Sequence, residues 1–295
     1  MESQLIESDL PLVSICCITY NHKDFIADAL NGFISQQTNF RFEIIIHDDA
    51  STDGTTEIVR QFELKYAGIV KPIYQLENQF SKGKKITAIT LSVAKGKYVA
   101  LCEGDDFWID PFKLQKQVDF LESNPNYVIC FHGTKISRNG EILDDYITKT
   151  RLDETKTTYD IFDLSLGNFI HTPTIVFRNI PNIYNDPLFV NSPIGDYILL
   201  LLLSKQGLIK RLTGDWAVYR VHGGGIWSSI NRTTKNDNII KYLIILSLGF
   251  KHPAVKNIKA RLNKLLLKRI IDNTKSLKCK RIFQDIQTFY RVNKS

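Results

Sequence analysis

Apolar and polar positions along the first 130 residues predict strands and helices in alternation. Short runs rich in β-branched residues are typical of strands, and apolar residues spaced three or four positions apart are typical of helices. The expected strands are 12–18, 42–47, 70–75 and 98–102, and the expected helices are 24–36, 51–66, 85–94 and 111–122. This alternation favours an α/β fold with a mostly parallel sheet flanked by helices, in which ligands bind at the carboxyl ends of the strands.

The pattern changes in the second half of the chain. Polar and turn-forming residues predict a loop or hairpin from 133 to 160. Beyond this segment we expect strands at 171–177, 208–212 and 216–221 and a helix at 193–205. After Trp227, apolar residues recur on one helical face between lysines and arginines. The pattern therefore predicts an α/β domain at 1–228 and a basic helical extension at 229–295.

The charge distribution separates the two parts. Residues 251–295 carry 13 basic and 2 acidic side chains, a net charge of +11, whereas the other 250 residues have a net charge of −4. A basic helical segment on a mildly acidic body suits an anionic partner such as a phospholipid membrane or a lipid diphosphate. Two alternatives stay open: the helices pack on the α/β domain, or on a second subunit in a homodimer. No nucleic-acid-reading motif accompanies the basic residues, so DNA and RNA are not expected partners.

Composition excludes several other classes of protein. Hydrophobic residues make up 43% and charged residues 23% of the chain, as in ordinary folded proteins. The longest apolar run, 198–203, is much shorter than the roughly 20 residues that span a bilayer. The polar first residues do not form a signal peptide, so we expect a cytoplasmic protein, peripheral on the cytoplasmic membrane face where its basic helices bind lipid. The five cysteines lack zinc-ligand spacing and are expected to be buried and reduced.

Acidic residues follow two expected strands at the edge where a ligand would bind. Asp48 and Asp49 end the second strand, and Glu103, Asp105 and Asp106 follow the fourth. Carboxylates at neighbouring strand ends repel one another unless a cation or hydrogen-bond donors compensate. A hard divalent ion, Mn²⁺ or Mg²⁺, held by one or two carboxylates and the oxygens of a diphosphate meets this requirement. The alternative interpretation is that each acidic pair caps the next helix.

Several motifs occur together in a recognisable order. They are VSICCITYN at 13–21, HDDASTDGT at 47–55, EGDDFW at 103–108, GDY at 195–197 and YRVHGGGIWS at 219–228. In this order and spacing the chain resembles, over about residues 11–228, the inverting family 2 glycosyltransferases. The resemblance implies a GT-A (Rossmann-like) catalytic domain with a mostly parallel mixed sheet, followed by the C-terminal helical extension. It also implies transfer of a sugar from a nucleotide-diphosphate donor to an acceptor hydroxyl.

The resemblance implies roles for individual residues. Nucleotide contacts fall on Thr19, Tyr20, Asn21, Asp49, Glu103 and Gly104, and metal ligands on Asp105, Asp106 and His222. Asp49 would accept a hydrogen bond from the imide N–H of a uracil-type base, which favours a UDP-sugar donor. Glu103 stands where the family's Asp-x-Asp motif begins with Asp, and would contact either the ribose or the metal. Asp196 matches the catalytic base, and Trp108, His171 and Trp227 are weaker candidates for contacts with the sugar or the acceptor.

The chemistry of sugar transfer explains these residue types. Departure of a nucleoside diphosphate places negative charge on the leaving oxygen, which a bound cation stabilises. One carboxylate acting as base on the acceptor hydroxyl is enough for direct displacement with inversion. For Asp196 the alternative is a simple acidic residue at a helix start. The expected acceptor is a carbohydrate or a lipid-linked molecule in the assembly of a surface polysaccharide or glycolipid.

Two other functions compete with this interpretation. A sugar-nucleotide nucleotidyltransferase has a similar sheet, but a glycine-rich basic loop would follow its first strand, where this chain has ITYNHKDF at 18–25. A non-catalytic relative that only binds a nucleotide or carbohydrate is the second alternative. The chain has neither a G-x-x-x-x-G-K-[ST] motif nor a G-x-G-x-x-G after its first strand, which argues against P-loop NTPases and dinucleotide dehydrogenases.

Overall fold

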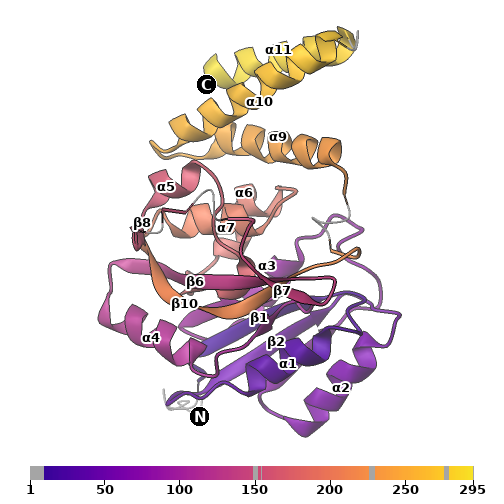
Figure 1. Ribbon diagram of the computed structural model, residues 1–295, viewed down its shortest axis with the longest axis vertical. Helices are drawn as coiled ribbons and strands as arrows, with labels where there is room; N and C mark the ends of the chain where they lie inside the picture. The colour runs from indigo at the N-terminus through magenta and orange to yellow at the C-terminus, as the bar shows by residue number, and fades with distance from the viewer. Residues whose placement is uncertain (1–9, 149–151, 154, 226–229, 276–278, 295) are drawn as a thin grey trace, which may run out of the picture.

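The computed structural model describes residues 10–148, 152–153, 155–225, 230–275 and 279–294 (Figure 1). A sheet of ten strands forms the centre of the α/β domain, in the order β3-β2-β1-β4-β9-β6-β10-β5, with β7 paired to β6 and β8 to β10. Helices cover both faces of this sheet, and the last three helices form a separate layer at one end of the molecule. The predicted mixed α/β sheet with a helical C-terminal extension is confirmed.

The first half of the chain forms the parallel part of the sheet. Strands β1 (Val13–Thr19), β2 (Phe42–Asp48), β3 (Val70–Tyr74) and β4 (Tyr98–Leu101) alternate with helices α1 (Ile26–Ile34), α2 (Thr55–Lys65) and α3 (Ile86–Val93). The strands pair in parallel as β3-β2-β1-β4. Their runs are apolar throughout because parallel strands are covered on both faces. All of these elements were predicted from periodicity, and their strands end at one common edge.

The second half of the chain adds mainly antiparallel strands. Strands β9 (Val176–Arg178), β6 (Tyr127–Arg138), β10 (Leu208–Val221) and β5 (Phe107–Trp108) continue the sheet beyond β4. Strand β9 is antiparallel to both β4 and β6, and β5 is antiparallel to β10. Only β6 and β10 pair in parallel here. Two short strands, β7 (Glu141–Asp144) and β8 (Thr158–Tyr159), extend β6 and β10 at their sides.

Two sequence expectations for this part of the chain were wrong. The strands expected at 208–212 and 216–221 are one long strand, β10, whose register shifts between Arg211 and Ala217. Gly214, with φ of +117°, lies in this irregular stretch, where a residue with a side chain would be strained. The strand expected at 171–177 is a 3₁₀ turn, η2 (Thr172–Thr174), followed by β9. The loop or hairpin expected at 133–160 does contain a hairpin, which the second half of β6 forms with β7.

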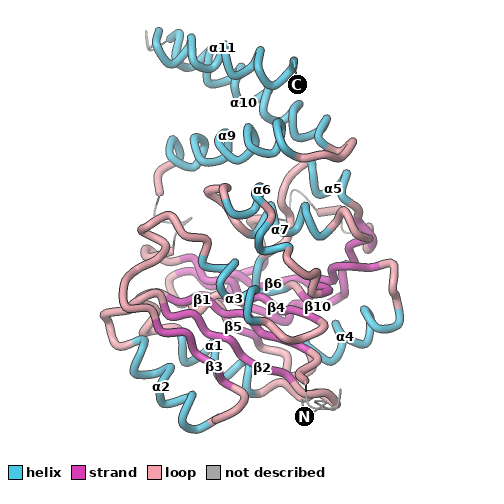
Figure 2. Tube along the Cα trace, turned by 180° about the vertical axis from the view of Figure 1, so that it is seen from behind, coloured by secondary structure: helices cyan, strands magenta, loops and turns pink. Residues whose placement is uncertain are grey.

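Two hydrophobic cores lie on the two faces of the sheet. One joins the sheet to α1, α2 and α4 (Lys113–Ser123) and includes Phe33, Ile44 and Leu114. The other joins it to α3 and to the helices that follow, and includes Phe177 and Leu199. These further elements are α5 (Ile161–Ser165), η3 (Ile183–Asn185), α6 (Pro187–Val190) and α7 (Asp196–Leu203). Figure 2 shows α3, α6 and α7 between the sheet and the C-terminal layer.

The C-terminal layer consists of α9 (Arg232–Gly249), α10 (Val255–Lys275) and α11 (Cys279–Lys294). Helix α10 contacts the α/β domain, where Arg261 donates to the hydroxyl of Tyr197 over 2.8 Å and Asn257 donates to Oγ of Ser165 over 2.9 Å. Ile258, Leu262 and Leu266 of α10 belong to the same core as α7. These helices therefore pack on the α/β domain. None of the helices in the described part of the chain combines the length and hydrophobicity that a transmembrane span requires.

Candidate active site

The loops after β1 and β2 are joined by hydrogen bonds at the carboxyl edge of the sheet. Asn21 has φ of 53°, in the left-handed region that Asn tolerates better than most residues. Its backbone N–H donates to Oγ of Ser51 over 2.9 Å, and its side-chain oxygen accepts from the N–H of Thr52 over 2.8 Å. Tyr20, beside it, is 44% exposed. Asn21 thus holds together two loops that were predicted to contact the nucleotide.

Asp49 organises the next loop of this edge. Its N–H donates to the carbonyl of Thr19 over 3.0 Å. Its two carboxylate oxygens accept from the N–H groups of Gln79 and Phe80 over 2.7 and 3.0 Å. The structure therefore brings Thr19, Asn21 and Asp49 together, as predicted. Asp48 instead accepts from the N–H of Ser51 over 3.1 Å, and its role is local to the start of α2.

Gly104 allows the acidic loop after β4 to lie directly against β1. Its N–H donates to the carbonyl of Ile18 over 2.9 Å. A Cβ atom at this position would lie 2.7 Å from Oγ1 of Thr19, closer than real contacts allow. The loop that begins at Gly104 carries Asp105 and Asp106, and one ligand atom each of Glu103, Asp105 and Asp106 lies within 4.8 Å of the others. The glycine is needed here for close approach of the two segments.

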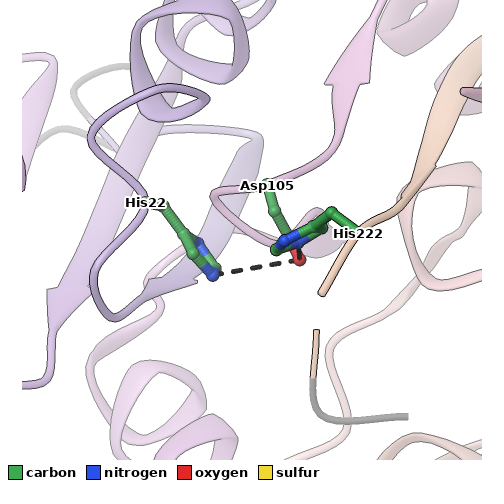
Figure 3. Close-up of side chains that lie close together, drawn as sticks. All are labelled: His22, Asp105 and His222. Atoms are coloured by element: carbon green, nitrogen blue, oxygen red, sulfur yellow. Dashed lines mark hydrogen bonds and ion pairs between the residues drawn. The ribbon is translucent and has the colours of Figure 1, made fainter. Parts of the chain in front are cut away.

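Asp105 lies between two histidines from distant parts of the chain (Figure 3). Nε2 of His222 donates to Oδ2 of Asp105 over 2.9 Å, and Nε2 of His22 lies 3.9 Å from the same oxygen. The ring of Phe25 packs 4.6 Å from that of His222 and 6.4 Å from that of His22, centroid to centroid. His22 follows β1 and His222 follows β10, so this cluster joins two strand ends to the loop after β4.

Arg220 fixes the acidic loop against the end of β10. Its backbone N–H donates to Oδ1 of Asp106 over 2.7 Å, and its guanidinium donates to the carbonyl of Asp105 over 2.8 Å. The same guanidinium pairs with Asp28 of α1 and lies 4.2 Å from the centre of the Phe107 ring. These contacts connect Asp105 and Asp106 to β10 and to α1.

The three carboxyls of this loop have strongly different affinities for protons. Burial, together with the charges of Asp105 and Asp196, raises the pKa of Glu103 to about 8. Burial and the neighbouring carboxylates raise the pKa of Asp106 well above its ordinary value. Burial would also raise the pKa of Asp105, but the hydrogen bond from His222 and the charges of both histidines lower it. The loop therefore gathers negative charge that a cation would stabilise.

Unpartnered atoms in this cluster fit a bound metal ion. Oδ1 of Asp105 and Oδ2 of Asp106 are buried and have no hydrogen-bond partner among the described residues. Buried carboxylate oxygens rarely lack partners, because the cost of removing them from water is then uncompensated. Burial lowers the pKa of His22, although the charge of Asp105 opposes the shift, and this favours the neutral imidazole that binds metals. Asp105, Asp106, His222 and His22 offer the oxygen and nitrogen ligands of a divalent-cation site.

Asp196, the predicted base, is the first residue of α7. Nδ2 of Asn168 donates to its Oδ2 over 3.4 Å. Nζ of Lys85, at the N-terminus of α3, donates to the carbonyl of Ser192 over 2.5 Å, and the side chain of Lys85 lies against Gly195. Burial raises the pKa of Asp196, whereas the N–H of Tyr197 and the charge of Lys85 lower it. Asp196 is near enough to Glu103 for its charge to raise the pKa of that residue.

The weaker candidates have different surroundings. Nε2 of His171 lies 3.2 Å from Oδ2 of Asp145, and its ring packs 4.9 Å from that of Tyr219. The charge of His171 also lowers the pKa of Asp196, so His171 borders the same site. Trp108 is 4% exposed; its indole N–H donates to the carbonyl of Pro173 over 2.8 Å. Trp108 is therefore part of the core. Trp227 lies outside the described residues.

Sequence analysis missed three residues of this site. His22 directly follows the motif at 13–21, and its position at a strand end was the available signal. Lys85 has no local signal, because its closeness to Asp196 depends on the packing of α3 against the turn before α7. Asp145 lies in a segment that was predicted as a loop or hairpin, where no local pattern indicates a partner for His171.

Comparison with known proteins agrees with this geometry. The profile of "Glycosyl transferase family 2" matches residues 14–180. The chain is 36% identical to the UDP-Glc:alpha-D-GlcNAc-diphosphoundecaprenol beta-1,3-glucosyltransferase WfaP of Escherichia coli, covering 82% of this chain and 88% of WfaP. It is 38% identical to an uncharacterized Mycobacterium tuberculosis protein over 74% of this chain, and spans 61% of that relative's length.

Solved structures share the fold. The Staphylococcus aureus protein TarS, residues 1–349 in complex with UDP-GlcNAc, superposes with a TM-score of 0.64 at 17% identity, covering 95% of this chain and 79% of the other. The mannosyltransferase PcManGT of Pyrobaculum calidifontis, in complex with GDP-Man and Mn²⁺, superposes with a TM-score of 0.61 at 17% identity, covering 97% and 76%. The fold is thus that of GT-A glycosyltransferases. With its profile match over more than half of the sequence, the chain belongs to glycosyl transferase family 2.

Proposed function

We propose that this protein is a metal-dependent, inverting glycosyltransferase that moves a sugar from a UDP-sugar to an acceptor hydroxyl. The main support for this proposal is the position of Asp105. Its carboxylate faces His222 and His22, keeps a buried oxygen without a partner, and adjoins Asp106 at the carboxyl edge of the sheet. In α/β sheets this edge is where ligands bind.

The ligand set favours Mn²⁺ over Mg²⁺. Asp105, Asp106 and His222 would hold the ion, with His22 close by. Asp105 belongs to both groups of closely spaced ligand atoms, one with His22 and His222 and the other with Glu103 and Asp106. Mg²⁺ prefers oxygen ligands only, whereas a site that includes imidazole nitrogen suits a softer first-row ion. The Mn²⁺ in the PcManGT complex supports the same choice. When bound, the ion would stabilise the negative charge that develops on the departing diphosphate.

The loops after β1 and β2 carry groups that suit the uracil base. Asp49 accepts two backbone hydrogen bonds, which orient its carboxylate and leave further lone pairs for the imide N–H of the base. Thr19 accepts from the N–H of Asp49 through its carbonyl, and Asn21 is bonded to the loop after β2. Oγ1 of Thr19 has no hydrogen-bond partner in the described structure. The UDP-Glc in the name of WfaP and the UDP-GlcNAc bound by TarS support a uridine donor.

Asp196 would take the proton of the acceptor hydroxyl. As the acceptor oxygen bonds to the anomeric carbon, the bond from this carbon to the diphosphate oxygen breaks on the opposite face, which inverts the configuration. Burial raises the pKa of Asp196 and so brings its basicity closer to that needed near neutral pH. Lys85 and Asn168 would orient the carboxylate. His171, held by Asp145, is near enough to Asp196 for its charge to lower the pKa of that carboxyl, and would contact the acceptor.

The acceptor class follows from the family relationship. The printed name of WfaP specifies a sugar on diphosphoundecaprenol as its acceptor. We propose a carbohydrate or lipid-linked acceptor in the assembly of a surface polysaccharide or glycolipid. Residues 1–228 would form the catalytic domain. Residues 229–295 would form an extension that helps to bring the acceptor to the active site.

Release of UDP from a panel of UDP-sugars with Mn²⁺ tests this proposal. Asp105→Asn should abolish Mn²⁺-dependent turnover and weaken Mn²⁺ binding in a calorimetric titration. Asp196→Asn should keep donor and Mn²⁺ binding but lose turnover by about 10²–10⁴-fold, the usual contribution of a general base. Asp110→Asn is the matched control, because Asp110 follows the same loop and accepts only from the start of α4 and from Lys116. Full turnover in Asp105→Asn would contradict the metal assignment, and full turnover in Asp196→Asn the base assignment.

A further inference from the structure

The outermost helices of the protein carry exposed apolar side chains. Leu267 and Ile271 lie on α10, and Phe283, Ile286 and Tyr290 lie on α11. Phe283 is 62% and Tyr290 63% exposed. We call these five residues the hairpin face. Large aromatic side chains grouped on a surface indicate an interaction site more often than scattered apolar residues do.

Helical spacing and the packing of α10 on α11 place these residues on the side away from the α/β domain. Leu267 and Ile271 are four positions apart, and Phe283, Ile286 and Tyr290 are three and four apart, so each set forms one stripe. The buried residues of α10 (Ile258, Leu262, Leu266) and of α11 (Asp285, Val292) occupy other sides of their helices. Figure 1 shows α11 and the second part of α10 at the end of the molecule, whereas the first part of α10 contacts the α/β domain through Asn257 and Arg261.

The hairpin is held in this arrangement by interactions between its helices. Nε of Arg269 donates to Oδ2 of Asp285 over 2.8 Å, and one of its terminal nitrogens donates to Asp237 of α9 over 2.8 Å. Asn263 and Asn293 exchange hydrogen bonds of 3.0 and 3.1 Å across the pair. The apolar stripes are therefore presented by a folded hairpin that α9 supports.

Basic side chains flank the hairpin face. Lys264 and Lys268 on α10 and Arg291 and Lys294 on α11 are exposed. They belong to the segment 251–295, which has 13 basic and only 2 acidic residues, and one of those two, Asp285, is buried in its pair with Arg269. The surface thus combines apolar and aromatic groups with positive charge.

We propose that the hairpin face docks on the surface of an anionic phospholipid bilayer. Aromatic and aliphatic side chains insert at the boundary between headgroups and acyl chains, and lysines and arginines beside them attract anionic headgroups. Charge complementarity selects this partner, because a second copy of the same basic face would bring like charges together. The inference rests on the proposed function in one respect: a bilayer is where a lipid-linked acceptor resides.

Sedimentation of the full chain with vesicles tests the docking. The protein should sediment with phosphatidylcholine vesicles that contain phosphatidylglycerol and not with phosphatidylcholine alone, and high salt should release it.

Phe283→Ser/Tyr290→Ser should lower the bound fraction at least about tenfold, since binding scales with buried apolar area. Lys264→Gln/Lys268→Gln should lower it as well while the apolar stripes stay intact. Leu64→Ser is the matched control, because Leu64 is an exposed apolar residue of α2, remote in the fold from the hairpin.

Three results would overturn the inference. They are absence of binding to anionic vesicles at low salt, equal binding of the Phe283→Ser/Tyr290→Ser variant, and a wild-type dimer that the same variant converts to monomer without any vesicle binding. Circular dichroism confirms that the variants keep α11. UDP release in the absence of vesicles should be equal in the wild type and the variants. If the protein does not bind vesicles, this assay still tests the transferase proposal. If it releases no UDP, the sedimentation experiment still tests the docking.

Discussion

His222 donates a hydrogen bond of 2.9 Å to Asp105, although 117 residues separate them in the chain. The contact joins the end of β10 to the loop after β4, and so connects the antiparallel half of the sheet to the parallel half. Asp105 had been assigned to the metal site from its position after a strand and from the resemblance, and His222 from the resemblance alone. The structure adds His22 on the other side of Asp105 at 3.9 Å.

Replacing His222 should weaken metal binding. We expect His222→Ala to raise the Kd for Mn²⁺ by at least about tenfold, since loss of groups around a metal usually costs 10–100-fold in affinity. Isothermal titration calorimetry measures this constant directly. His252→Ala is the control, because His252 lies in the connection between α9 and α10. An unchanged Kd in His222→Ala would remove this residue from the ligand set.

Replacing Lys85 should shift the pH dependence of turnover. The charge of Lys85 lowers the pKa of Asp196, so its removal in Lys85→Met raises that pKa. Activity requires the unprotonated carboxylate, and the acidic limb of the kcat profile should therefore move to higher pH, so that kcat falls on the acidic side of the profile.

Two further variants define this effect. Lys85→Arg keeps the charge and should hold the limb near its wild-type position. Lys84→Met, at the neighbouring exposed lysine, should leave the profile unchanged. Donor affinity should be the same in all of them, because Lys85 lies beside Gly195 and Ser192. A Lys85→Met profile with an unmoved limb would contradict the role of Lys85 in orienting and stabilising Asp196.

Lys113 should make stability depend on pH. It is fully buried, its ammonium lies 4.0 Å from the centre of the Trp108 ring, and burial lowers its pKa from 10.5 to about 7. Between these values the unfolded chain binds a proton that the folded protein does not, so stability rises with pH in this window. Relative to Lys113→Met, the wild type should gain up to about 1.4 kcal/mol per pH unit above pH 7.

Urea unfolding of both proteins at pH 7, 8 and 9 measures that difference. Lys113→Met also leaves Oε1 of Gln117 without its 2.7 Å partner, which costs a constant amount at every pH and leaves the slope unaffected. Parallel stability curves for the two proteins would show that Lys113 keeps its ordinary proton affinity in the fold.

Gly104→Ala should destabilise the acidic loop. The added Cβ would lie 2.7 Å from Oγ1 and 2.8 Å from Cβ of Thr19, so the loop must move away from β1. We expect a loss of about 1–3 kcal/mol in the free energy of unfolding, the usual cost of overpacking. Gly223→Ala is the matched control, since a Cβ there meets nothing within 4 Å. Equal stability of the two variants in urea unfolding would contradict the close approach of the two segments.

The parallel half of the sheet could be predicted because each of its elements is determined locally. Apolar runs such as 13–19 and 42–48 are long enough to be recognised as buried strands, and the helices between them show their own period. The acidic residues at their ends were expected to meet, since parallel strands end at one edge. Glu103, Asp105 and Asp106 of one loop do lie together there. Asp49 of the other strand end instead accepts from the N–H groups of Gln79 and Phe80.

The antiparallel half could be predicted only in part. The residue pattern predicts extended structure within 208–221, but as two strands. Pairing with β6 makes this segment one strand, β10, whose register is irregular. Trp108 illustrates the same limit for side chains. Its sequence neighbours are site residues, yet strand β5 turns the ring into the core beside Phe33 and Lys113.

The sequence by itself determined the periodicity of the strands and helices, the family motifs and the basic character of the last 45 residues, because each depends on residues close together in the chain. Only the tertiary structure decided which partners those residues meet: His22 and His222 at Asp105, Lys85 at Asp196, and the apolar stripes of α10 and α11 on one outer surface. Such contacts arise when burial of the two hydrophobic cores brings segments that are distant in sequence together. No local sequence pattern specifies which distant segments meet.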